Sequence, residues 1–314
     1  MSSDEAQVGG GETATRLPLE TVWVPDGPRR RLEQWALDLF AAIPTRSKAR
    51  KMAKREELLV NGAPCRGSVF LDAGDRIERV EPPGPPPPLY RCALEVVYED
   101  DHMAVVVKPP GIATNGVWLK TLEHALPAHL GPSPEPDALR WPRPAHRLDG
   151  PTGGLVAVGK TATALAGLSG AFERRAVAKR YRAIAIGRLS GAGWMDAPID
   201  GRSALSRFVA VQHTRALRSD WLTTVDLYPA TGRTHQLRRH LADRGHPILG
   251  DAQYGIEGMV LRGKGVFLFA ATLAFAHPTT GEPLAFEAPE PPKFESLRAR
   301  EARRFHRFRS GESG

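Results

Sequence analysis

The stretch HRLDGPTGGLVAVGKT, from His146 to Thr161, contains two patterns that point to different proteins. Its second half, Gly154 to Thr161, satisfies the phosphate-loop pattern G-x-x-x-x-G-K-[ST] at every position. Its first half places Asp149 directly before the glycine-rich segment Gly150 to Gly154, a turn that can hold a carboxylate at the surface of a domain. The fold and the chemistry depend on which half is functional.

The phosphate-loop match is filled with residues that favour a strand, Leu155 to Val158. In a working phosphate loop the backbone N–H groups wrap the ligand, whereas N–H groups inside a strand bond to the neighbouring strands. No clear apolar strand ending in aspartate is present to bind magnesium. We therefore expect a buried strand here, a helix that starts near Thr161, and no nucleotide cofactor.

The composition indicates a soluble protein with a polyanionic partner. The chain has 314 residues, enough for two domains, and 41% of them are apolar. Its 43 basic and 35 acidic residues give a net charge of +8, and nucleic acid is the usual partner of such a chain. Cys65 and Cys92 form no C-x-x-C motif, the N-terminus lacks the features of a secretory signal, and the run Gly265 to Ala276 is too short to span a bilayer. These features favour a cytoplasmic protein.

The chain divides into five segments of different composition. They are a polar, disordered tail (1–25), a small basic domain (26–82), a stiff proline-rich linker (83–91), a larger domain rich in strand signals (92–292) and a basic helix or tail (293–314). The larger domain mixes strands with two helical segments. We predict an α+β protein, in which a mostly antiparallel mixed sheet forms the larger domain and a small α+β domain precedes it.

The small domain carries a basic helix. Apolar residues recur at helical spacing in RRLEQWALDLF, Pro44 ends that helix, and Thr45 can cap the next one. A hairpin turn is predicted at Asn61-Gly62. The second helix offers these candidate phosphate contacts: Arg46, Lys48, Arg50 and Lys51.

A second conspicuous stretch, TGRTHQLRRHLADRGHP, covers 231–247. We expect a helix capped by Thr234, with Leu237 and Leu241 on its apolar face and Arg238 at the edge of a cleft. A buried carboxylate needs a cationic partner to stay ionised. Arg238 is therefore a candidate partner of Asp149, although spacing alone does not pair the two.

Metal and serine chemistry are the alternatives for this region. The potential metal ligands are His235, His240, His246 and Asp251. The first two histidines are five residues apart, about 140° around a helix, so they would not converge on one ion. Ser169 lies in GLSGA, which is not the G-x-S-x-G motif of a nucleophilic serine. We expect neither a metal site nor a serine nucleophile.

Taken together, these motifs resemble a known family. HRLDGPTGGL, KRYRAIAIG, TGRTHQLRRHLADRGHPILGDAQYG and FAATLAFAHPTTGEPLAFEAP look like the successive motifs of the RluA-type pseudouridine synthases, and YEDDHMAVVVKPPGIATN looks like the family's opening strand and lysine-proline turn. The resemblance covers about residues 92 to 292. Residues 29 to 82 are similar to the alpha-L RNA-binding domain that often precedes this domain. The chain departs from the family at Gly153, where serine is common, and at Phe269, where histidine is common.

The resemblance implies an RNA pseudouridine synthase that needs no cofactor or metal. It implies that Asp149 is the catalytic group, that Arg238 pairs with it, and that Tyr181 stacks on the uracil. Further contacts to RNA are expected from Arg147, His146 and Arg233. The substrate that the resemblance favours is large-subunit ribosomal RNA, and the protein is expected to be a monomer.

Two other functions stay open at this stage. One is a synthase that acts on transfer RNA. The other is a non-catalytic RNA-binding or ribosome-assembly protein, against which the presence of Asp149, Tyr181 and Arg238 argues. Release of tritium from 5-tritiated uridine separates an enzyme from a protein that only binds RNA.

Overall fold

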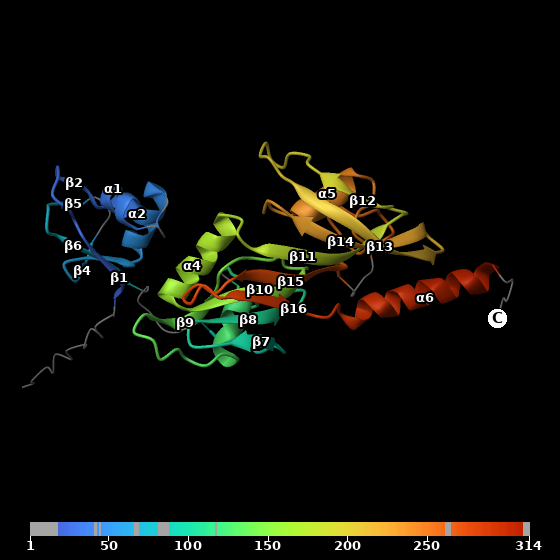
Figure 1. Cartoon of the computed structure of the whole chain (residues 1–314), viewed down its shortest axis with the longest axis horizontal. Helices are drawn as coiled ribbons and strands as arrows, with labels where there is room; N and C mark the ends of the chain where they lie inside the picture. The colour runs from blue at the N-terminus through green and yellow to red at the C-terminus, as the bar shows by residue number, and fades with distance from the viewer. Residues whose placement is uncertain are drawn as a thin grey trace, which may run out of the picture. The chain divides into compact units, whose positions relative to one another are not determined.

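The structure is a computed structural model that describes residues 18–40, 43, 45–65, 69–80, 88–116, 118–260 and 265–309. The chain forms two compact units, Met1–Pro85 and Pro86–Gly314 (Figure 1). Most of the predicted tail and part of the proline-rich linker lie outside the described residues. No helix in the described part of the chain is long and apolar enough to cross a membrane.

The first unit is a small α+β domain. Its elements are β1 (Pro18–Trp23), β2 (Arg30–Arg31), α1 (Leu32–Leu39), α2 (Arg46–Lys54), β3 (Leu58–Val60), β4 (Ala63–Pro64), β5 (Phe70–Leu71) and β6 (Arg76–Val80). One sheet has the strand order β1-β6-β3-β4, and β2 pairs with β5 separately. Strand β1 falls within the segment predicted to be disordered. That prediction is wrong for 18–23, because the TVWV stretch pairs with β6 and Val24 is buried in the core of the unit.

Local sequence signals determine the turns of this unit. Thr45 caps α2, since its hydroxyl accepts a hydrogen bond from the Lys48 N–H at 3.2 Å. Asn61 and Gly62 connect β3 to β4 with φ values of 52° and 83°, the left-handed conformations that a tight two-residue hairpin requires. Both features follow the sequence prediction.

The second unit is built on a ten-stranded mixed sheet with the order β12-β13-β14-β11-β15-β10-β8-β7, where β16 pairs with β15 and β9 with β10. Its strands are β7 (Glu95–Glu99), β8 (Met103–Lys108), β9 (Ala138–Pro144), β10 (Gly153–Thr161), β11 (Ala178–Ile186), β12 (Ala192–Met195), β13 (Ser206–Ala216), β14 (Asp220–Pro229), β15 (Leu268–Ala276) and β16 (Pro283–Glu287). Its helices are α3 (Leu122–Ala125), the 3₁₀ helix η1 (Leu126–Ala128), α4 (Ala162–Glu173), α5 (Gln236–Asp243) and α6 (Pro292–Arg309). Among the named strands of this unit, only β10 and β15 pair in parallel.

The phosphate-loop look-alike is part of β10. Its residues pair antiparallel with β8, from Leu155 opposite Val107 to Val158 opposite Ala104. The Thr161 hydroxyl then caps α4 by accepting from the Ala164 N–H at 3.1 Å. The prediction of a strand followed by a helix is therefore confirmed.

Strand β10 lies near the middle of the sheet and is buried on both faces. Leu155 and Ala157 belong to the main core, to which α4, α5 and α6 contribute side chains. Val156 and Val158 belong to a second cluster on the opposite face, which includes residues of α3 and η1. Figure 1 shows α4 beside β10 at this point of the sheet. Such a buried strand provides a rigid base for the turn that precedes it.

Candidate active site

Asp149 lies in a turn whose backbone is bonded on both sides. The Thr152 N–H donates to the Asp149 carbonyl at 3.0 Å, which closes the turn. The buried Leu148 anchors its start: the Leu148 N–H donates to the Thr114 hydroxyl at 3.0 Å, and that hydroxyl donates to the Leu148 carbonyl at 2.9 Å. The Asp149 side chain is only 20% exposed. The carboxylate is therefore presented from a rigid turn.

Lys108, at the end of β8, bonds to the same turn from inside the protein. Its side chain is fully buried, and Nζ donates to the carbonyl groups of Ile112 at 2.8 Å, Pro109 at 3.1 Å and Gly150 at 3.3 Å. Burial lowers the pKa of Lys108 to about 8, against the opposing effect of the Asp149 charge. The sequence analysis did not include Lys108 in the site. The signal for it was the K-P-P-G segment that follows an apolar strand.

Two glycines allow the turn to pass directly into the parallel pair of β10 and β15. Gly154 has a φ of 120°, and a Cβ atom there would lie 2.3 Å from the Ala270 carbonyl oxygen. Gly153 is the register partner of Phe269 in this pair. The two positions at which the chain departs from the family pattern are therefore neighbours in the sheet, and Phe269 is buried in the main core.

The structure brings Arg238 and Asp149 together. Arg238 is buried in α5, and its Nη1 donates to Asp149 Oδ2 at 3.4 Å. Its shorter bonds go to Asp251, from Nε at 2.6 Å and from Nη2 at 2.8 Å. From the sequence, Asp251 was considered only as a potential metal ligand. Its bidentate contact orients the guanidinium and leaves one donor aimed at Asp149.

The Asp251 carboxylate is fixed by several hydrogen bonds. Its side chain is completely buried, and Oδ1 also accepts from the N–H groups of Gln253 at 3.0 Å and Tyr254 at 3.2 Å. Burial raises its pKa, but the bonds from Arg238 and from these N–H groups outweigh burial and lower it below the ordinary value. Asp251 therefore stays ionised at neutral pH as the fixed partner of Arg238.

The start of α5 differs from the prediction. The N-cap is His235, in a left-handed conformation with a φ of 55°, whereas Thr234 was expected there. The buried Gln236 side chain fixes the loop before the helix, because its Oε1 accepts from the Thr231 hydroxyl at 2.7 Å and from the Arg233 N–H at 2.9 Å. Arg233 itself donates from Nε to the Ser203 carbonyl at 3.0 Å, so it lies at the edge of the loop.

His235 also reaches the site. Its Nε2 lies 3.8 Å from Asp149 Oδ1, and its Nδ1 is 3.0 Å from the Tyr254 hydroxyl. The other histidines weighed as metal ligands have different partners: His240 contacts Ser206 and Ala197, and His246 contacts the Ile186 carbonyl. Among the described residues, no group of three or more His, Cys, Asp or Glu side chains is arranged to bind a metal.

Tyr181 lies on β11, opposite Leu227 of β14 and Ala270 of β15. Its side chain packs against the core clusters on both faces of the sheet. Burial, and after it the negative charge of Asp149, raise the pKa of the Tyr181 hydroxyl far above its ordinary value. The hydroxyl is therefore protonated at neutral pH, and the Asp149 charge acts on it electrostatically.

His146 is bonded within the protein, and its contact to RNA stays a prediction. Its Nε2 accepts from the Ala157 N–H at 3.0 Å, and its ring stacks on Phe172 with the centroids 4.0 Å apart. Burial, together with the positive charge of Lys179, lowers the pKa of His146 to about 3, so the ring is neutral. Arg147, the next residue, is exposed.

The predicted phosphate contacts of α2 divide into two groups. Arg46, Lys48 and Lys51 are exposed. Arg50 is exposed as well, but it donates to Glu33 of α1, from Nε at 3.2 Å and from Nη2 at 3.1 Å. Glu33 is almost completely buried, so this ion pair joins the two helices and gives Arg50 a structural role.

Known proteins share the sequence pattern and fold of this chain. A model of the family described as RNA pseudouridylate synthase matches residues 102–243, which include Asp149, Tyr181 and Arg238. The chain is 32% identical to the ribosomal large subunit pseudouridine synthase D of Vibrio parahaemolyticus, over 85% of this chain and 84% of that protein. It is 34% identical to the protein of the same name from Pseudomonas aeruginosa, over 84% of this chain and 90% of that one.

Among solved structures, human RNA pseudouridylate synthase domain containing 1 is similar to this chain, with a TM-score of 0.54 and 27% identity over 66% of this chain and 87% of that one. The large mixed sheet is therefore the pseudouridine synthase fold. The chain belongs to the RNA pseudouridylate synthase family and is an RNA pseudouridine synthase.

Proposed function

We propose that the enzyme isomerises uridines of large-subunit ribosomal RNA and that Asp149 performs the chemistry. The observation that carries the proposal is the Asp149 carboxylate, presented from a clamped turn with one directed guanidinium donor 3.4 Å away. The choice of RNA rests on the names of the relatives, which are ribosomal large subunit pseudouridine synthases. A ribosomal substrate implies a cytoplasmic enzyme.

The reaction explains why one carboxylate is enough. The N1–C1′ bond of uridine breaks, the uracil turns, and a C5–C1′ bond forms. The proton leaves C5, and N1 ends the reaction with a proton. No electron is gained or lost overall, so no redox cofactor is required. A carboxylate can serve as the nucleophile or as the base in such a sequence.

Arg238 and Asp251 act together as the support of Asp149. Asp251 takes two short bonds from the guanidinium, so the third and longer bond orients Asp149 while leaving its other oxygen available. The two carboxylates share the Arg238 guanidinium, and the Lys108 ammonium adds a second positive charge beneath the turn of Asp149. This balance lets a charged aspartate remain in a site from which the incoming uracil excludes water.

Tyr181 and Arg147 are the proposed contacts to the target nucleotide. The target base must leave its stack, which costs a few kcal/mol. Tyr181 offers an aromatic ring and a protonated hydroxyl near Asp149. The exposed Arg147 can bind the phosphate backbone or occupy the space that the base vacates.

The first unit is proposed as an alpha-L-like RNA-binding domain. Its helix α2 exposes Arg46, Lys48 and Lys51 on a small separate unit that carries none of the residues of the active site. Such side chains supply phosphate contacts that are independent of sequence. We propose that a single copy of the chain binds its RNA in this way.

Tritium release tests the proposal. Transcripts of large-subunit ribosomal RNA and of transfer RNA, both labelled with 5-tritiated uridine, are incubated with the enzyme. We expect release from the ribosomal transcript, together with a missing pseudouridine in the ribosomal RNA of a strain that lacks the gene. Release only from transfer RNA would reject the ribosomal substrate. Binding without release from either RNA would indicate an assembly protein instead.

A further inference from the structure

Helix α6 carries a stripe of arginines that the proposed active site does not use. The helix contains seven basic and two acidic residues, a net charge of +5 in a chain whose total is +8. Four of its arginines, Arg300, Arg303, Arg304 and Arg307, follow the spacing i, i+3, i+4, i+7. This spacing places them on one face of the helix, over a length of about 10 Å. We call these four residues the α6 arginine stripe.

Most of the stripe is exposed: Arg303, Arg304 and Arg307 are exposed, and Arg300 is half-buried. The stripe lies beside the buried face of the helix, which packs against β13 and consists of Phe294, Leu297, Arg298 and Glu301. All four arginines lie outside that buried face, and Arg303 has no hydrogen bond or ion pair with any residue that the structure describes. Like charges four residues apart destabilise a helix. A row of like charges on one exposed face of a helix suits a negatively charged partner.

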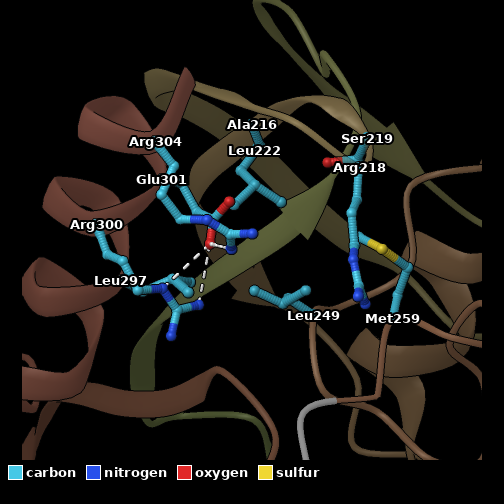
Figure 2. Close-up of a pocket in the computed structure, with 10 residues that line it drawn as sticks. All are labelled: Ala216, Arg218, Ser219, Leu222, Leu249, Met259, Leu297, Arg300, Glu301 and Arg304. Atoms are coloured by element: carbon cyan, nitrogen blue, oxygen red, sulfur yellow. Dashed lines mark hydrogen bonds and ion pairs between the residues drawn. The ribbon is translucent and has the colours of Figure 1, made fainter. Parts of the chain in front are cut away.

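A cavity beside the stripe is also lined by Arg218, which lies in the turn between β13 and β14. It has a volume of about 430 Å³ and a floor of Leu222, Leu249 and Met259. Figure 2 shows Arg218 on one side of this cavity and Arg300 and Arg304 on the other. Guanidinium groups from the β13–β14 turn and from α6 thus line the same cavity.

The positions of these guanidinium groups are supported by bonds to the protein. Arg218 donates to the Gly258 carbonyl at 3.0 Å. Glu301 accepts from Arg300 at 3.0 Å and from Arg304 at 3.4 Å (Figure 2). Among the residues that the structure describes, Glu301 is the one acidic side chain that lines this cavity. Part of the positive charge is therefore oriented before any partner binds.

The surface is too far from Asp149 to touch the target base. Strands β14, β11 and β15 separate β13, on which α6 packs, from β10, which follows Asp149. Four strand spacings correspond to about 19 Å. In Figure 1 the last turns of α6 extend beyond the β13–β14 hairpin. A ligand on the stripe must therefore be long if the active site binds it as well.

We propose that the α6 arginine stripe and Arg218 bind the phosphate backbone of the substrate RNA at a distance from the target uridine. The inference rests on the proposed function, since it takes RNA as the polyanion that reaches both places. Arginine suits this role because its planar guanidinium forms bidentate bonds to phosphate. The surface adds affinity for long RNA and leaves the chemistry at Asp149 unchanged.

The test replaces the four arginines of the stripe together by glutamine. For a long ribosomal RNA we expect KM to rise several-fold with kcat unchanged. The slope of log Kd against log salt concentration should become shallower by about 0.9 for each lost contact to duplex phosphate. A short stem-loop that ends within about 19 Å of the target should be modified as before.

Glu301→Gln is the matched control, because it removes the acid that neutralises Arg300 and Arg304. It should bind long RNA more tightly, whereas damage to helix packing would weaken both variants. An unchanged salt slope and unchanged KM in the stripe variant would overturn the inference. Tritium release from the stem-loop by the wild-type enzyme measures the proposed function separately, so failure of one is distinguishable from failure of the other.

Discussion

Arg238 and the α6 arginine stripe use the same side chain in opposite environments. Arg238 is 4% exposed, and three of its nitrogen atoms donate to two carboxylates. The arginines of the stripe lie on an outer helix face, where water and salt screen them. A buried arginine acts through directed bonds, whereas surface arginines act through summed charge. Loss of Arg238 should lower kcat, whereas loss of the α6 arginine stripe should raise KM.

The largest effect among the supporting residues is expected for Arg238→Met. The change leaves Asp149 and Asp251 without their cation, and breaking a buried ion pair costs about 3–5 kcal/mol. If this loss falls on the transition state, single-turnover tritium release should slow by roughly 10²- to 10⁴-fold. A thermal melt by circular dichroism checks that the variant is folded. A folded variant within tenfold of the wild-type rate would show that Arg238 does not support the chemistry.

A smaller loss is expected for Asp251→Asn. The amide keeps the shape, but it loses the charge and offers only one acceptor oxygen to a guanidinium that donates two bonds to the carboxylate in the wild type. Arg238 should then be less well oriented, and kcat should fall by about 10- to 100-fold, a range typical of residues that orient a ligand. The slope of RNA binding against salt should not change. Wild-type kcat in this variant would mean that Arg238 is oriented without Asp251.

The lowered pKa of Lys108 predicts that kcat and the free energy of unfolding respond to pH in opposite directions. Above pH about 8 its amine becomes neutral and has two N–H groups for three carbonyl acceptors, so kcat should fall. Between this value and the ordinary 10.5, the unfolded chain binds more protons than the folded one. The contribution of Lys108 to the free energy of unfolding therefore rises with pH over this range.

Urea unfolding of the wild type and of Lys108→Met, measured from pH 7.5 to 10, isolates the contribution of this lysine. The difference in unfolding free energy between the two proteins should shift in favour of the wild type as the pH rises. A constant difference would mean that the lysine is not desolvated as the structure implies. Wild-type kcat should be followed by tritium release over the same range.

The smallest effect is expected on helix α2. Replacing Arg46, Lys48 and Lys51 by glutamine should raise KM a few-fold and make the salt slope shallower, with kcat unchanged, because these side chains are exposed. Arg50→Gln is the control, since it leaves the buried Glu33 unpaired and should lower the melting temperature instead. If both changes alter RNA binding equally, the division of α2 into binding and structural residues is wrong.

The sequence predicted features that depend on local patterns. The apolar filling of the phosphate-loop match led to strand β10, and Thr45 and Asn61-Gly62 led to the ends of α2 and β3. Asp251 was missed as the main partner of Arg238, because 13 residues and the end of α5 separate the two. The Asp251 carboxylate reaches the Arg238 guanidinium only because the chain folds back after α5.

Other long-range contacts were not visible in the sequence. The motif that contains His146 does not show that its ring bonds to Ala157 and stacks on Phe172. Thr234 looked like a helix cap, but the left-handed His235 occupies the N-cap position. Strand β1 was invisible in a polar terminus because its partner, β6, lies more than fifty residues along the chain.

The most direct test of the account is Asp149→Asn, purified from a strain that lacks the wild-type gene. The amide keeps the shape of the side chain and removes its charge and its nucleophile. We expect no tritium release from 5-tritiated ribosomal RNA in a single turnover, with the Kd for that RNA within a few-fold of wild type. Pseudouridine formation by this variant, free of wild-type enzyme, would contradict the assignment of the chemistry to Asp149.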